Sequence, residues 1–170
     1  IDFGQGVTVN LGVDPNDSNN SVLELIKSET ARSYAGVSIA TNESQTIDPI
    51  PFDPDNGVVT INARVWASEP GTEFLMQVAD SATTHDLNVV ATTATTTVAG
   101  WNDLVFDFSA PIERWADSAN DGFGGPHLTS LQDNVVYDQL QIFPDWGNGY
   151  AHDDAGGGPV GTPKAGTYYV

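Results

Sequence analysis

Residues 58–66 read VVTINARVW and residues 101–109 read WNDLVFDFS, and both segments alternate apolar and polar side chains. A period of two is the pattern of a β-strand that turns one face to a core and the other face away from it. In the first segment the apolar face consists of Val59, Ile61, Ala63 and Val65. The two segments therefore predict two half-buried strands.

Similar short segments recur along the chain and are separated by turns rich in Gly, Pro, Asn and Asp. The other expected strands are residues 7–11, 22–27, 34–40, 74–80, 87–98, 135–143 and 167–170. The side chains expected to point inward are Phe74, Met76 and Val78 in residues 74–80, and Leu104, Phe106 and Phe108 in residues 101–109. We expect residues 14–20, which are rich in Asn and Asp, to be a turn or loop. The Pro-rich residues 47–57 should also be a loop, because Pro cannot donate a hydrogen bond to a sheet. No segment shows a helical period. This pattern predicts an all-β fold, an antiparallel β-sandwich of the jelly-roll type. We expect one domain over residues 1–170, with an irregular insertion at 110–134.

The formal net charge of −18 excludes several classes of ligand. Nucleic acids require a basic surface, and anionic membranes and polyanionic sugars are repelled for the same reason unless a cation bridges them. We therefore expect no nucleic-acid or membrane partner. The charge itself is typical of a protein kept soluble in a salty medium.

The chain contains no cysteine, so disulfides and thiolate metal sites are excluded. No apolar run is long enough to span a bilayer. We interpret the chain as a monomeric module of a longer, processed multidomain protein that is secreted or held at the cell surface.

Function should show on the strand faces that point away from the core. Pyranose rings stack on planar aromatic side chains, and their hydroxyls need amide or guanidinium partners. The residues of these types that strand parity turns outward, or that follow such a strand, are Arg64, Trp66, Gln77, Gln141 and Trp146. Single surface aromatics are common, but this set together predicts a carbohydrate-binding face.

Four further aromatics are less decisive. Tyr34 and Tyr150 are expected to be lesser stacking platforms. Trp115 lies in the insertion, where it either folds over the binding face or packs within a loop. Trp101 begins a strand whose other large residues belong to the core, so we interpret it as structural.

A calcium ion is the expected cofactor. Asp53-Pro54-Asp55-Asn56-Gly57 resembles half of a calcium loop, with oxygen ligands at alternate positions, although the downstream Glu of an EF-hand is missing. Asp2 is a third candidate ligand. The three histidines lack the paired spacing of a zinc site.

Enzymatic alternatives remain open but have weaker support. A glycosidase needs two carboxylates at a defined separation, and in so acidic a chain some pair is always present. A lyase would need Tyr, His and Arg on one face, and no His falls on an expected strand. No nucleophile elbow, phosphate loop or dinucleotide fingerprint occurs. The other alternative is a structural or adhesive domain of a surface protein.

Four segments and the final strand carry a family resemblance. They are residues 23–39 (LELIKSETARSYAGVSI), 65–71 (VWASEPG), 101–109 (WNDLVFDFS), 137–147 (YDQLQIFPDWG) and 167–169. Together they resemble carbohydrate-binding modules appended to laminarinases and related glycoside hydrolases of marine bacteria. Tyr34 stands where these modules more often have Trp, Trp146 stands where Phe is usual, and the 110–134 insertion has no counterpart.

The resemblance implies a β-jelly roll, often with structural calcium, that binds β-glucans such as laminarin. On this basis we predict a non-catalytic module that recognises a neutral polysaccharide, with a laminarin-like β-1,3-glucan first. Trp66 and Trp146 would be the main stacking platforms, and Arg64, Gln77 and Gln141 would bind hydroxyls.

Overall fold

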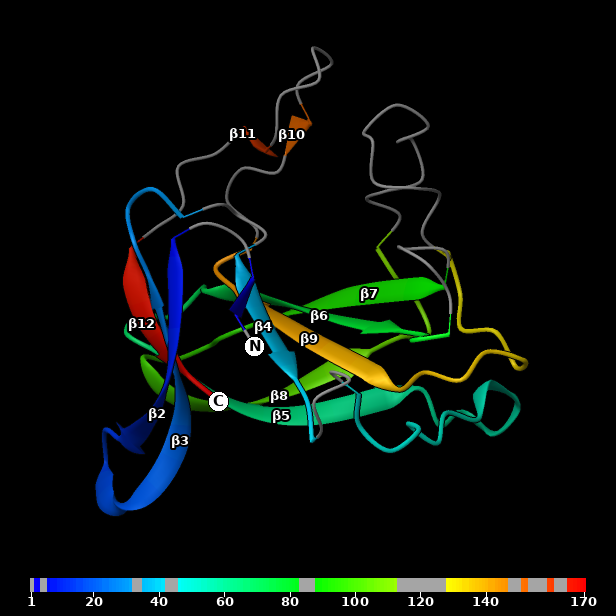
Figure 1. The fold of residues 1–170 in the computed structure, drawn as a ribbon, viewed down its shortest axis with the longest axis horizontal. Helices are drawn as coiled ribbons and strands as arrows, with labels where there is room; N and C mark the ends of the chain where they lie inside the picture. Colours follow the sequence, from blue (N-terminus) through cyan, green and yellow to red (C-terminus); the bar gives the residue numbers. More distant parts are fainter. Residues whose placement is uncertain are drawn as a thin grey trace.

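The chain is a sandwich of two antiparallel sheets, seen in a computed structural model (Figure 1). The structure describes residues 2–3, 6–31, 35–41, 46–82, 88–112, 128–146, 151–152, 159–160 and 165–170.

The first sheet, which we call the front sheet, has five strands in the order β2-β3-β12-β5-β8. These strands are β2 (Val7–Asp14), β3 (Asp17–Lys27), β12 (Gly166–Tyr169), β5 (Thr60–Ala67) and β8 (Gly100–Asp107). The β2–β3 hairpin projects beyond the layer formed by β5 and β8, as its blue ribbon in Figure 1 shows.

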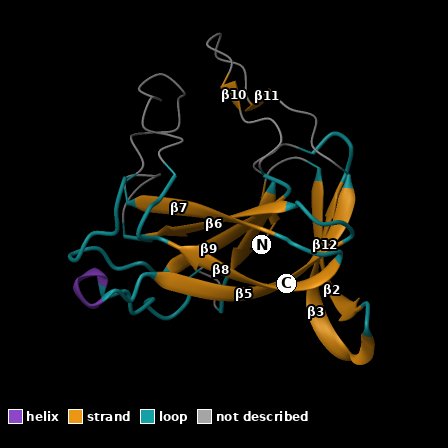
Figure 2. Cartoon of the chain, turned by 180° about the vertical axis from the view of Figure 1, so that it is seen from behind, coloured by secondary structure: helices purple, strands orange, loops and turns teal. Residues whose placement is uncertain are grey.

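The second sheet, the back sheet, has the order β1-β4-β9-β6-β7. Its strands are β1 (Asp2–Phe3), β4 (Gly36–Ile39), β9 (Gln139–Pro144), β6 (Glu73–Ala79) and β7 (Val89–Thr95). A separate pair joins β10 (Ala151–His152) to β11 (Pro159–Val160). The helical element of the described residues is a 3₁₀ turn, η1 (Pro54–Asn56), drawn in purple in Figure 2. None of the described helices is long and apolar enough to cross a membrane.

The core lies between the two sheets and is built from the residues that alternation turns inward. From the back sheet it takes Val37, Phe74, Met76, Val78, Val90 and Ile142. From the front sheet it takes Leu25, Val65, Leu104, Phe106 and Tyr168. The predicted inward faces of residues 58–66, 74–80 and 101–109 are therefore confirmed, as is the all-β sandwich.

The nine expected strands are all present, with shifted ends. The largest difference is at residues 14–20, which we expected to be a loop. Only Pro15 and Asn16 form the turn, and Asp17 already belongs to β3. The Asp14 side chain accepts a hydrogen bond from the Asn16 backbone N–H at 2.8 Å. This local bond closes the turn in two residues, so the following Asn and Asp residues continue as a strand.

The described ends of the predicted insertion, residues 110–112 and 128–134, contain no strand or helix. Both ends bond to β7: the Ile112 N–H donates to the Ala91 carbonyl, and the Leu128 N–H donates to the Val89 carbonyl.

Candidate functional site

One line of side chains crosses the outer face of the front sheet from edge to edge. The register pairs Asn10 with Glu24, Glu24 with Tyr169, Tyr169 with Trp66, and Trp66 with Trp101. Residues paired directly in an antiparallel sheet point to the same face. We call these five residues the cross-strand row. None of them is buried: Asn10 is exposed and the other four are partly exposed.

Two aromatic rings of the row are in contact. Trp66 and Tyr169 meet edge to face, with ring centroids 5.4 Å apart and an interplanar angle of 82°. This is a favoured geometry for aromatic pairs. Next to them, the Asn10 amide donates to a Glu24 carboxylate oxygen at 3.1 Å. Burial, together with the charge and hydrogen bond of the Glu24 side chain, raises the pKa of Tyr169.

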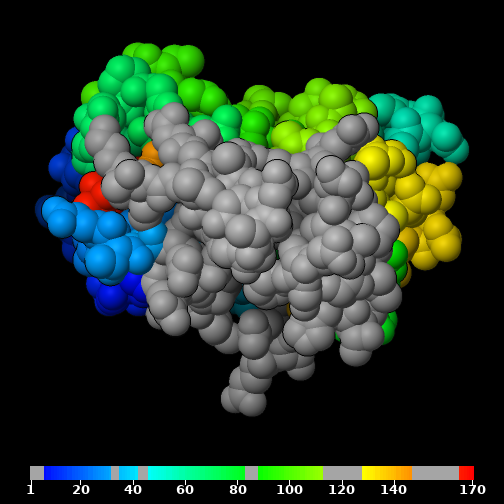
Figure 3. All heavy atoms as spheres, turned by 90° about the horizontal axis from the view of Figure 1, so that it is seen from above, coloured from blue at the N-terminus to red at the C-terminus, as the bar shows by residue number. Residues whose placement is uncertain are grey.

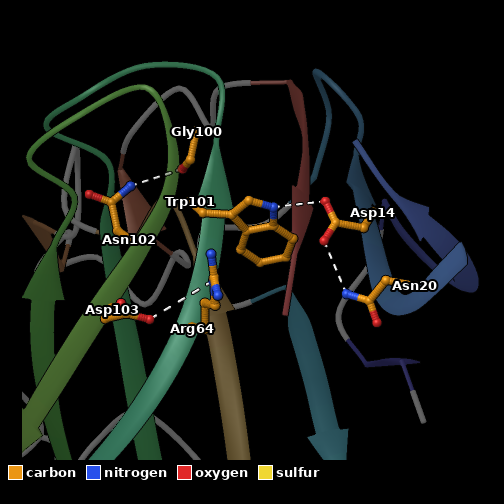
Figure 4. Close-up of polar contacts among 7 residues, drawn as sticks. All are labelled: Asp14, Asn20, Arg64, Gly100, Trp101, Asn102 and Asp103. Carbon is orange, nitrogen blue, oxygen red and sulfur yellow. Dashed lines mark hydrogen bonds and ion pairs between the residues drawn. The ribbon is translucent and has the colours of Figure 1, made fainter. Parts of the chain in front are cut away.

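Trp101 reaches from β8 to the projecting hairpin, as Figure 4 shows. Its indole N–H donates to a carboxylate oxygen of Asp14 at 2.9 Å, and the Asn20 amide donates to the other oxygen at 3.0 Å. The pairing of β2 with β3 shifts register between Val13 and Asp14, and such irregularities can re-aim a side chain. Hydrogen bonds, first from the Asn16 backbone and then from Asn20, lower the pKa of Asp14. The Asp14 carboxylate thereby joins the β2–β3 hairpin to β8.

Arg64 lies beside the row. Its guanidinium carbon is 5.4 Å from the centroid of the Trp101 ring, and its Nε is 4.0 Å from an Asp103 carboxylate oxygen. The side chains of Arg64 and Asp103 are 68% and 89% exposed. An ion pair that is so exposed to water contributes little to stability. The Arg64 guanidinium can therefore leave Asp103 and bind another hydrogen-bond acceptor.

A buried amide shapes the turn that precedes Trp101. Asn102 accepts hydrogen bonds from the backbone N–H groups of Thr97 and Val98, and its Nδ2 donates to the carbonyls of Val98 and Gly100. Gly100 has φ of 101°, a conformation that favours glycine. Gly100 and Asn102, the two neighbours of Trp101 in sequence, therefore fix the turn from which β8 begins.

Two of the predicted binding residues, Trp66 and Arg64, do lie together on the front sheet. Trp101, which we interpreted as structural, is not part of the core: it is partly exposed on the outer face beside Arg64, and its indole N–H holds Asp14. The alternation of β8 could have shown this: Trp101 has the parity of Asp103 and Val105, which are exposed, and not that of the buried Leu104. Tyr169 and Glu24 have no comparable signal, because their place in the row depends on pairing between distant strands.

Gln77 and Gln141 lie on the other side of the molecule. They face each other on β6 and β9 of the back sheet, and the Gln77 amide donates to the Gln141 carbonyl at 2.8 Å. Both side chains are half-buried, and the Gln141 amide reaches the Ser38 hydroxyl at 3.5 Å. The prediction that they share a face with Trp66 is wrong, because β6 and β9 belong to the back sheet whereas β5, which carries Trp66, belongs to the front sheet.

Trp146 is buried, with 1% of its surface exposed, so the prediction of an open stacking platform is wrong. The Trp146 ring packs on Phe143, with ring centroids 5.3 Å apart. The residue before it, Asp145, has a left-handed backbone conformation with φ of 51°. Leu75, Ala91 and Ile112 complete this apolar group, which we call the back cluster. The predicted platforms Tyr34 and Tyr150, and the candidate binding residue Trp115, lie outside the described residues.

The predicted calcium ligands do not assemble into a site in the part of the chain that is described. Asp53 caps η1: its two carboxylate oxygens accept from the backbone N–H and the amide of Asn56, at 3.1 and 2.9 Å. Across residues 6–31, 35–41, 46–82, 88–112, 128–146 and 165–170, no group of three or more His, Cys, Asp or Glu side chains could hold a metal ion. Asp2 lies in β1, where the structure does not describe side chains. The described residues around Asp53 therefore do not fit a calcium site, and calcium stays a prediction.

Asp53 and Asp55 instead line a hollow of about 350 Å³ at one end of the sandwich, together with Phe52, Asp133 and Tyr137 among others. The two loops that form it lie side by side in Figure 3, teal and yellow, at the opposite end from the blue residues of β2 and β3. Phe52 is edge-on to Tyr137, with centroids 5.7 Å apart. This hollow is far along the molecule from the cross-strand row.

The charged side chain of Lys27 is directed between the two sheets. Lys27 follows the inward parity of β3, is 2% exposed, and donates from Nζ to the Pro144 carbonyl of β9 at 2.8 Å. Burial lowers the pKa of Lys27 to about 8, and the nearby Asp145 carboxylate opposes this shift. Burial, with smaller effects of Asp145 and Glu69, raises the pKa of Tyr168. Lys27 therefore ties the front sheet to the back sheet, at a cost in solvation.

Comparison with known protein families finds no model that matches this chain, and no curated protein sequence is significantly similar to it.

Proposed function

We propose that the chain is a non-catalytic carbohydrate-binding module and that the outer face of the front sheet holds a neutral polysaccharide. The observation that carries this proposal is the cross-strand row, which places Trp101, Trp66 and Tyr169 in register on three adjacent strands of one outer face. None of the three rings is buried.

The chemistry of a pyranose chain suits such a row. Its C–H groups pack on aromatic rings, and its hydroxyls require acceptors and donors at the edges of those rings. Here the groups next to the rings include the Arg64 guanidinium and the Glu24 and Asp14 carboxylates, and the two carboxylates are already held by amides. Few rotamers remain to be fixed when a ligand binds, which favours affinity.

The local charge supports a neutral ligand. The charged residues beside the aromatic rings include one cation, Arg64, and three carboxylates, Asp14, Glu24 and Asp103. An anionic glycan would meet more like charge than opposite charge on this face, and it would approach a chain of net charge −18. Among neutral glycans we propose a laminarin-like β-1,3-glucan, on the family resemblance of the sequence.

The proposal extends to the setting of the module. Two five-stranded antiparallel sheets, between which the chain crosses several times, support assigning the fold to the jelly rolls. We also propose that the module is secreted or displayed at the cell surface within a larger chain, where it would tether that chain to its polysaccharide.

Calorimetric titration of the chain with laminarin and, in parallel, with the polyuronate alginate tests the ligand class. We expect heat of binding with laminarin and none with alginate. Binding of alginate alone would overturn the neutral-glycan assignment. Release of reducing ends or unsaturated products from either polysaccharide would show that the chain is an enzyme.

A further inference from the structure

The cross-strand row has a polar half as well as an aromatic half. Trp101, Trp66 and Tyr169 occupy β8, β5 and β12, and the row continues onto β3 and β2 with Glu24 and Asn10. Four inter-strand steps of about 4.8 Å give it a length of roughly 19 Å. A ligand that follows the row therefore passes from stacking groups to hydrogen-bonding groups.

The polar half of the row, Glu24 and Asn10, carries groups that can form hydrogen bonds with sugar hydroxyls. The Asn10 amide donates to Glu24, and Glu24 is paired in register with Tyr169 at the junction of the two halves. A charged acceptor makes stronger hydrogen bonds than a neutral one. Asn10 is exposed and Glu24 is partly exposed, so both can be reached from outside.

The alternative path runs along a strand instead of across the sheet. From Trp66 it would follow the outward residues of β5 to Arg64 and Asn62. Along that path the local groups include the Arg64–Asp103 pair, and β8 contributes the apolar Val105 opposite Asn62. A ligand that runs along β5 would meet one outward aromatic ring, Trp66, whereas a ligand that follows the cross-strand row would meet three.

From this arrangement we infer that the glycan lies across the strands, along the cross-strand row, and that Glu24 and Asn10 determine specificity by binding its hydroxyls beyond Tyr169. The inference rests on the proposed function. It adds two residues that lie on strands distant in sequence from the aromatic platform, and it assigns the direction in which the ligand runs.

Oligosaccharide length provides the test. A laminari-disaccharide can occupy only part of the row, whereas a laminari-hexasaccharide can span it. Calorimetry with both should show that Asn10→Ala and Glu24→Ala each lower the affinity for the hexasaccharide by about three- to tenfold. Their affinity for the disaccharide should stay within about twofold of the parent chain, because the stacking rings of Trp66 and Trp101 are unchanged.

Asn62→Ala is the matched variant, because it removes an exposed amide from the same outer face but away from the row. It should leave both affinities unchanged. A loss with Asn62→Ala and none with Asn10→Ala would overturn the inference in favour of a ligand that runs along β5. Thermal unfolding of each variant checks that the fold is retained, and Glu24→Gln, which keeps the shape of the side chain, replaces Glu24→Ala if the latter unfolds.

The two proposals fail differently. If the parent chain binds neither oligosaccharide, or if Trp66→Ala leaves binding intact, the proposed function is wrong. If binding needs Trp66 but responds to neither Asn10 nor Glu24, the site stands and the inferred direction is wrong.

Discussion

The two outer faces of the sandwich obey the same alternation and yet have different surroundings. On the front sheet the outward Trp66 is partly exposed and stands in a line of aromatic and polar side chains. On the back sheet the outward Leu75 and Phe143 are 0% and 4% exposed, under a group that includes Trp146 and Ile112. The alternation along a strand therefore predicts which side chains point away from the core, but not whether those side chains are exposed to solvent.

The difference explains why the predicted binding residues separate. Trp66 and Arg64 share an open face, Gln77 and Gln141 share a half-buried one, and Trp146 is part of a second apolar layer. Burial of a large aromatic side chain stabilises a fold, whereas a partly exposed one is available to a ligand. The two faces should consequently respond to substitution in different ways.

The largest effect is expected in the back cluster. Trp146→Ala removes a buried ring from Phe143 and Leu75, and we expect the free energy of unfolding to fall by about 3–5 kcal/mol. Urea denaturation measures it, and Trp146→Phe, which keeps an aromatic ring, should cost less. A Trp146→Ala chain of unchanged stability would contradict the assignment of this residue to a core.

A smaller loss of stability is expected at the turn before Trp101. Asn102→Ala leaves two backbone N–H groups and two carbonyls without their partner, and we expect a cost of about 2–3 kcal/mol. The exposed Asn62→Ala on the same sheet should change the unfolding free energy by no more than about 0.5 kcal/mol. Equal effects of the two substitutions would show that Asn102 does not shape the front face.

Lys27 links the two sheets, and its stability contribution should depend on pH. Its pKa is lowered to about 8 in the folded chain from 10.5, so between these values the unfolded chain binds more protons and stability rises with pH. Relative to Lys27→Met, the parent chain should gain about 1–2 kcal/mol between pH 8 and pH 9.5. Urea denaturation of both chains over this range measures the difference. A constant difference would show that the amine titrates as it does in water.

Much of the fold could be predicted from the sequence, because the alternation of apolar and polar residues can be recognised in each strand separately. The inward faces of residues 58–66, 74–80 and 101–109 needed no knowledge of their partners. Even the projecting hairpin could have been found from the two-residue Pro15–Asn16 turn. Residues 14–20 differ from the prediction because Asn and Asp favour turns but also occupy the exposed part of β3.

The candidate site could be predicted only in part. Trp66 and Arg64 are two residues apart on one strand, so parity alone brings them together. Glu24 and Tyr169 are far apart in sequence, and they meet only because β12 inserts between β3 and β5. The burial of Trp146 depends on the path of the chain after β9, which no period encodes.

The most direct test of the central claim compares one residue from each outer face. Laminarin is titrated by calorimetry into the parent chain, Trp66→Ala and Gln77→Ala. We expect Trp66→Ala to lose about 1–3 kcal/mol of binding free energy, and Gln77→Ala to bind like the parent chain. The opposite result, intact binding in Trp66→Ala and lost binding in Gln77→Ala, would place the glycan on the back sheet and contradict the account.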